Sequence, residues 1–160
     1  MAQSSFVMHE EEFGEITVII ERLLREANAK CVYLVVKDGQ LISSSGDTAE
    51  IDVTSLASLT AGNIAATGGM AKLIGEKEFS VLFHEGERDN LHISLVAQRV
   101  ILVVIFDKRS SIGLVRLRVK KAGDELGKTI QKLVDKMEEV TDKVTLLEEI
   151  TDDDIEKLFS

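Results

Sequence analysis

The sequence predicts an α/β domain of the α+β type, in which a five-stranded antiparallel sheet carries helices on both faces. Two observations predict the sheet: five apolar or alternating stretches, and short polar connections that suit antiparallel neighbours. A third predicts the helices, because apolar residues recur at three- and four-residue steps before, between and after these stretches. With 160 residues, 44% of them apolar, the chain is long enough for one domain with its own core.

The first elements along the chain are a helix and a hairpin. Residues 10–28 are predicted to form an amphipathic helix, since Phe13, Ile16, Ile20, Leu23 and Ala27 share one face. Residues 30–37 are rich in β-branched side chains and are followed by Asp38-Gly39, a hairpin turn signal. Residues 40–45 then form the returning strand.

The segment 53–71 carries no charged residue, although 29% of the chain is charged. We predict a helix that begins near Asp52 or Thr54 and ends near Gly75. Its larger apolar side chains gather on one face: Leu56, Leu59, Ala66, Met70, Leu73 and Ile74. Its small residues gather on the other face: Ala57, Ala61, Ala65 and Gly68. Gly69 and Lys72 lie at the margin of that face.

A surface helix normally turns charged residues away from its apolar stripe. We therefore interpret the small-residue face as an outward protein-contact surface that lets another backbone approach closely. The alternative is a core helix sandwiched within its own domain.

The second half of the chain is predicted to hold three strands and a long helix. Residues 78–85 and 91–98 alternate apolar and polar positions, whereas 100–106 are continuously apolar and predict a central strand. The closing helix is expected over 110–137, and the domain over residues 1–137.

Two segments remain after that helix. Residues 138–150 are expected to be a linker or frayed helix. Residues 151–160 are expected to be an amphipathic docking segment with Ile155, Leu158 and Phe159 on one face; the alternative is a disordered terminus.

Composition limits the possible functions. The net charge of −9 argues against general nucleic-acid binding, and 53–71 is too rich in Ser, Thr, Asn and Gly for membrane insertion. The lone Cys31 cannot form an internal disulfide and suits a reducing cytosol. The N-terminus lacks a secretory signal pattern.

No catalytic pattern is present in the sequence. The three histidines lack metal-ligand spacing, the serines lack a paired general base, and the glycines form no phosphate-binding loop. We therefore expect no metal, no cofactor, no catalytic residues and no enzyme activity.

A block of basic residues follows the last strand, with no acid between Lys108 and Asp124. It contains Arg109, and Arg116 and Lys120 share one helix face at a four-residue spacing. The block is either a solvated surface that offsets the acidic tail or a surface that attracts an acidic partner.

Four segments resemble the roadblock/LC7 fold and, within it, the MglB family. They are DGQLISSSG (38–46), IDVTSLASLTAGNIAATGGMAKLIGEKEF (51–79), VILVVIFDKRSSIGLVRLRVKKA (100–122) and ITDDDIEKLFS (150–160). MglB proteins are partners of the small Ras-like GTPase MglA in bacterial polarity and gliding motility. The resemblance covers residues 6–137 and the last eleven residues.

The resemblance implies a homodimer in which the second helices and third strands meet at the two-fold axis. It implies a GTPase-activating protein that supplies no arginine finger, with one GTPase bound on the second-helix surface and touched by the C-terminal segment. It also implies a cytoplasmic location and leaves open concentration at a cell pole. Two other classes remain: a dimeric scaffold that tethers a GTPase or motor, and a small-molecule sensor, for which the sequence shows no polar pocket.

Overall fold

The computed structural model describes residues 9–148, and the side chains through Lys143. The elements in chain order are α1 (Glu10–Glu26), β1 (Cys31–Val36), β2 (Leu41–Gly46), α2 (Val53–Leu73), β3 (Val81–Glu85), β4 (Asn90–Val96), β5 (Val100–Phe106) and α3 (Ile112–Glu148). The strands form one sheet in the order β2-β1-β5-β4-β3, and all neighbours are antiparallel. The predicted fold class is confirmed.

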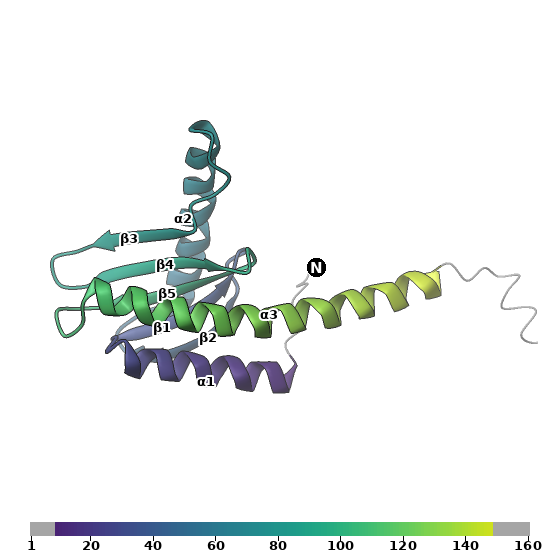
Figure 1. The fold of residues 1–160 in the computed structure, drawn as a ribbon, viewed down its shortest axis with the longest axis horizontal. Helices are drawn as coiled ribbons and strands as arrows, with labels where there is room; N and C mark the ends of the chain where they lie inside the picture. Colours follow the sequence, from purple (N-terminus) through teal and green to yellow (C-terminus); the bar gives the residue numbers. More distant parts are fainter. Residues whose placement is uncertain (1–8, 149–160) are drawn as a thin grey trace, which may run out of the picture.

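The helices divide unequally between the two faces of the sheet. Helices α1 and α3 lie side by side over one face, and α2 crosses the other (Figure 1). The predicted arrangement of helices on both faces is therefore confirmed.

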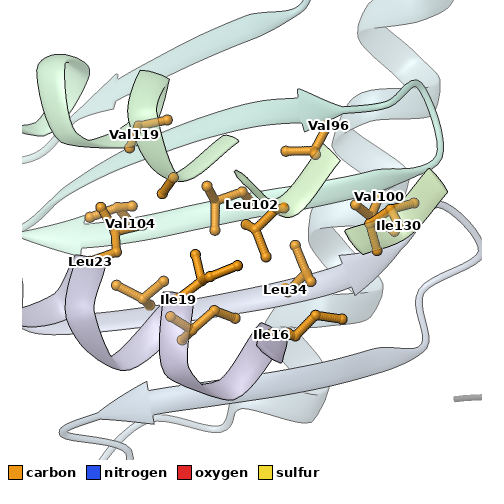
Figure 2. Packing of buried hydrophobic residues seen from close by; sticks show 14 of the residues in the cluster. Ile16, Ile19, Leu23, Leu34, Val96, Val100, Leu102, Val104, Val119 and Ile130 are labelled. Carbon is orange, nitrogen blue, oxygen red and sulfur yellow. The ribbon is translucent and has the colours of Figure 1, made fainter. Parts of the chain in front are cut away.

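The face under α1 and α3 holds the larger core. Because successive strand residues point to opposite faces, Val32, Leu34, Leu102 and Val104 point toward these helices. Figure 2 shows Leu34 and Leu102 among the aliphatic side chains of α1, including Ile16 and Ile19. Several leucine and isoleucine side chains here are fully buried: Ile16, Ile20, Leu34, Leu102, Leu126, Ile130 and Leu133.

Ion pairs join α1 to α3 at the edge of this core. Lys136 Nζ lies 2.7 Å from Glu12 Oε1, Lys132 Nζ lies 3.3 Å from Glu15 Oε1, and Arg22 pairs with Glu125. Glu12 is only 1% exposed, and the positive charge of Lys136 offsets the free-energy cost of burying its carboxylate. Phe13, predicted on the buried stripe of this helix, is instead 43% exposed.

The opposite face holds a smaller core, in which Tyr33, Val35, Val103 and Ile105 lie under α2. The Tyr33 hydroxyl lies 3.0 Å from Thr60 Oγ1, and this buried hydrogen bond ties α2 to β1. Burial raises the pKa of Tyr33.

Two predicted boundaries need correction. Strand β3 begins at Val81 rather than residue 78. Helix α3 continues to Glu148, so residues 138–148, expected to be a linker or frayed helix, are part of the helix. No glycine or proline occurs between Lys128 and Glu148 to end the helix. The predicted docking segment 151–160 lies outside the described residues.

Candidate protein-binding surfaces

The first part of α2 is oriented opposite to the prediction, with its small residues toward the sheet. Ala57 is fully buried and Ala61 is 9% exposed, so this part of the small-residue face packs on the sheet. Most large side chains of the other face point into solvent: Leu59, Met70, Leu73 and Ile74 are 70%, 60%, 88% and 69% exposed. Leu56 is half-buried against the core. The reason is steric, because alanine lets the helix lie close over bulky side chains such as Tyr33.

The C-terminal part of α2 extends past the sheet (Figure 1). Ala65, Gly69 and Lys72 are exposed there, and Gly68 is half-buried. Together with Ala61, these residues line a hollow of about 290 Å³. We call it the α2 hollow. The structure therefore brings the five predicted α2 residues together, with Ala61 at the buried end.

An ion pair closes one side of the α2 hollow. Lys37 Nζ, at the end of β1, lies 2.7 Å from Glu78 Oε1, and both residues line the hollow. Neither residue belonged to the predicted site. Their contact joins segments forty-one positions apart, which the sequence pattern does not reveal.

Strand β3 lies at the edge of the sheet, and in the described residues its only strand neighbour is β4. Its other backbone edge can pair with an additional strand. Asn63 Nδ2 on α2 lies 3.1 Å from His84 Nε2 on β3, so the two elements are held together. The exposed apolar face of α2 thus lies near a free sheet edge.

Arg109 lies far from the α2 hollow, at the opposite end of β1. Asn28, just before that strand, donates from Nδ2 to the Arg109 carbonyl at 2.6 Å, whereas the hollow contacts Lys37 at the strand's end. Asp107 holds the side chain, with Arg109 Nε at 3.0 and 3.2 Å from its two oxygens. This contact raises the pKa of Arg109 and lowers that of Asp107.

Arg116 and Lys120 lie on the other face of the sheet, on the exposed surface of α3. They share one helix face, as predicted, and line a groove of about 570 Å³ between α3 and strands β3 and β4. The eleven predicted binding residues therefore do not form one site. The eight described ones divide among the α2 hollow, the Arg109 turn and this groove.

Sequence reasoning missed the interior of that groove. His92 and Ser94 line it and are 2% and 7% exposed. Burial, followed by the charge of Arg116, lowers the pKa of His92. The alternation of β4 leaves His92 as either a packed or a surface histidine, and the sequence does not show that α3 leaves a groove beside it.

Three carboxylates, from Glu11, Glu12 and Glu15, converge on α1. Lys136 and Lys132 on α3 already pair with two of them. We therefore interpret the group as part of the contact between these helices rather than as a metal site. No helix within residues 9–148 has the length and apolar character needed to cross a membrane.

Comparison with known proteins identifies the family. Residues 15–106, more than half of the chain, match the family model described as the Roadblock/LC7 domain. The chain belongs to the Roadblock/LC7 family. A comparison with curated protein sequences gives no match.

Solved structures place the chain near the MglB members of the Roadblock/LC7 family. Myxococcus xanthus MglB is 63% identical over 79% of this chain and 96% of its own, with a TM-score of 0.76. The gliding protein MglB of Thermus thermophilus is 29% identical over 82% of this chain and 99% of its own, with a TM-score of 0.77. An MglB described as having a tetrameric arrangement gives the same values.

The Roadblock/LC7 match contains some of the candidate surfaces and not others. It contains α2 with its hollow and β3, but it ends at Phe106, before Arg109 and α3. The long α3 helix, with Arg116 and Lys120, is thus an addition to the part that matches the family model.

Proposed function

We propose that this chain is a homodimeric GTPase-activating protein for a small Ras-like GTPase of the MglA type, with no active site of its own. The observation that carries the proposal is the exposed apolar face of α2, together with the similarity to MglB proteins. Leu59, Met70 and Leu73 of α2, together with Ile74 at its C-cap, are more than half exposed. Such clustering marks a contact surface.

In the proposed dimer, two α2 helices pack through these side chains and two β3 edges pair across the two-fold axis. Burial of one leucine-sized side chain contributes about 1.5–3 kcal/mol. Four such side chains per copy, with new backbone hydrogen bonds between strands, support stable association. The MglB described with a tetrameric arrangement is consistent with contacts between copies in this family.

Dimer formation is tested by sedimentation equilibrium at micromolar concentration. We expect a dimer for the native chain and a folded monomer for the Met70→Glu/Leu73→Glu variant. Leu117→Glu is the matched control, because Leu117 is 62% exposed on α3, away from the proposed contact. A native monomer, or a control that dissociates equally, would contradict the proposed dimer.

The α2 hollow is the proposed contact for the GTPase. Gly68 and Gly69 keep this part of α2 free of side chains, and an added Cβ at either position meets no atom within 4 Å. A backbone or switch loop of the partner can therefore approach closely. By binding the GTP-bound conformation that is aligned for hydrolysis, the chain increases the population of that conformation.

The proposed activation uses the catalytic groups of the GTPase itself. Arg109, the arginine most suited by position to act as a finger, is tied to Asp107. It also lies at the opposite end of β1 from the α2 hollow. Arg116 and Lys120 lie on the other face of the sheet, where they can attract or bind an acidic partner rather than reach the nucleotide.

The decisive experiment measures phosphate release by an MglA-type GTPase with and without this protein. We expect faster hydrolysis, and we expect Gly69→Arg to abolish it while the dimer stays folded. Gly14→Arg is the matched control, because an added Cβ at this exposed helical glycine also meets no atom within 4 Å. Binding without a rate change would instead support the alternative function, a non-catalytic dimeric scaffold.

Whether Arg109 acts as an arginine finger is tested by GTP hydrolysis at a saturating concentration of this protein. We expect Arg109→Ala to leave saturated turnover nearly unchanged, whereas loss of a finger costs a factor of about 10³–10⁵. A thousandfold loss with binding intact would overturn the finger-free mechanism. It would leave the activating function in place.

The C-terminal segment, with Ile155, Leu158 and Phe159, is proposed to touch the bound GTPase and to tune its affinity. Removal of residues 151–160 should leave the dimer intact and change the GTPase kinetics. A cytoplasmic location, with recruitment to a cell pole, belongs to the same proposal, and fluorescent tagging in cells tests it.

A further inference from the structure

The groove between α3 and the β3–β4 edge is separate from the α2 hollow, the proposed GTPase contact. It is about 570 Å³ in volume, which is large enough to hold several side chains. Val81, Val96 and Val119 give it an apolar lining, and Val81 is 48% exposed. We call it the α3 groove.

A buried polar group lines the α3 groove and has no partner. His92 is 2% exposed, and its Nδ1 atom makes no hydrogen bond among the described residues. Most buried polar atoms in proteins are hydrogen-bonded, so an unpaired one calls for an explanation. Its position in the lining suggests that the groove has an occupant.

The charges around His92 indicate an anionic occupant. Two cations, Arg116 and Lys120, line the α3 groove from the same helix face, and Arg116 is near enough to lower the pKa of His92. The remaining charged residue in the lining is Asp124, one turn beyond Lys120. No charged residue of β3 or β4 lines the groove among the described residues.

The chain itself contains a segment of complementary chemistry. Residues 149–160 carry five acidic residues and one lysine, and three of the acids are consecutive, Asp152 to Asp154. The apolar residues that follow, among them Ile155 and Leu158, match the apolar lining of the groove. This combination of acids and large apolar side chains occurs once in the sequence outside the described residues.

A copy cannot place this segment in its own groove. Lys120 precedes Glu148 by 28 residues of helix, about 42 Å at about 1.5 Å per residue. Asp154 follows Glu148 by six residues, which span at most about 22 Å when fully extended. The side chains of lysine and aspartate do not close a gap of about 20 Å. The occupant must therefore come from another molecule.

We propose that the α3 groove binds the acidic C-terminal segment of a second copy of this chain. The carboxylates of Asp152 to Asp154 pair with Arg116 and Lys120, and Ile155 or Leu158 enters the apolar part of the groove. In a two-fold dimer the exchange is reciprocal, so each groove holds the segment of the other copy. The segment is then held by the protein itself when no other partner binds it. The inference does not depend on GTPase activation.

Zero-length carbodiimide cross-linking of the full chain tests the proposal. Unlabelled and ¹⁵N-labelled copies are unfolded and refolded together, so that mixed assemblies form. We expect links between Lys120 and Asp152–Asp154, with one peptide light and the other heavy. Lys128 is the matched control, since it is exposed on the same helix but lines a different hollow, between α3 and α1. It should give few links.

Four cross-linking outcomes overturn the proposal. Links confined to peptides of the same label would mean that each copy binds its own segment. Equal links at Lys120 and Lys128 would mean nonspecific contact along α3. An absence of Lys120 links would mean that the groove does not hold the segment, and links to an added GTPase alone would assign it to that partner.

The titration of His92, followed by NMR of the full chain, gives an independent measurement. Nearby carboxylates favour the protonated imidazole, whereas Arg116 and Lys120 oppose it. We therefore expect a higher His92 pKa in the native chain than in the Asp152→Asn/Asp153→Asn/Asp154→Asn variant. These substitutions lie outside the described domain and leave its core unchanged. An identical His92 titration in the two proteins would contradict the proposed contact.

Discussion

The two faces of the sheet differ in how their helices cover them. On one face, α1 and α3 bury large aliphatic side chains and are joined by ion pairs such as Lys136–Glu12. On the other, α2 lies alone, packs through Ala57 and Ala61, and leaves Leu59 and Met70 in solvent. We therefore expect the first face to provide most of the chain's own stability and the second to provide the main surface for contacts with other proteins.

A charge on the buried side of α2 should have the largest effect. Ala57→Arg places an unpaired charge against the sheet, and we expect a loss of at least about 3–5 kcal/mol of folding free energy, enough to unfold many single domains. Ala65→Arg, two helical turns later and exposed, should change stability by no more than about 0.5 kcal/mol. Circular dichroism with urea unfolding measures both. Two equally stable variants would show that α2 does not pack through alanine.

Truncation of a large core residue under α1 and α3 should come next. Leu126 is fully buried, so Leu126→Ala should cost about 2–5 kcal/mol, set by how far the cavity relaxes. Leu117→Ala, on the exposed side of the same helix, should be nearly neutral. Urea unfolding measures both changes in stability, because a shifted midpoint with an unchanged slope reports a change in the free energy of unfolding. A nearly neutral Leu126→Ala would remove the proposed difference between the faces.

The buried hydrogen bond under α2 should have a smaller effect. Tyr33→Phe and Thr60→Val each remove one partner of the pair and keep most of its shape. A typical intramolecular hydrogen bond contributes about 0.5–1.5 kcal/mol, and we expect losses of this size. The double variant should cost less than the sum of the two single variants, because both remove the same bond. Full additivity would mean that the two hydroxyls are not coupled.

The smallest effect concerns His92 and pH. Burial and Arg116 lower its pKa in the folded state, so the unfolded chain takes up the proton first as pH falls. The native chain should therefore lose stability as pH falls below about 6.5, the ordinary histidine value, until the folded pKa is passed. His92→Leu should lack this part of the pH dependence. Urea unfolding of the native chain and the variant is compared between about pH 7.5 and 5, a range that spans the ordinary histidine pKa. The same pH dependence of the free energy of unfolding in both proteins would contradict a lowered His92 pKa.

The elements of this fold were largely readable from the sequence, because they follow from local pattern. The continuous apolar run 100–106 is the central strand β5, and Asp38-Gly39 forms the predicted turn, with Gly39 at a φ of +102°. Asp52 begins α2 as expected, since its carboxylate accepts from the Ser55 backbone N–H at 3.1 Å. Each of these features depends on residues that are close in sequence.

Tertiary packing decided what local pattern left undetermined. Both faces of α2 are uncharged up to Ala71, so amphipathicity does not orient the helix, and the bulky side chains of β1 and β5 selected its alanine side. The same applies to the binding residues. Arg116 and Lys120 share a helix face in the sequence pattern, but only the folded sheet separates them from the α2 hollow and leaves a groove beside His92. Local spacing determines which residues share an element, whereas the side of the sheet that an element covers depends on contacts between distant segments.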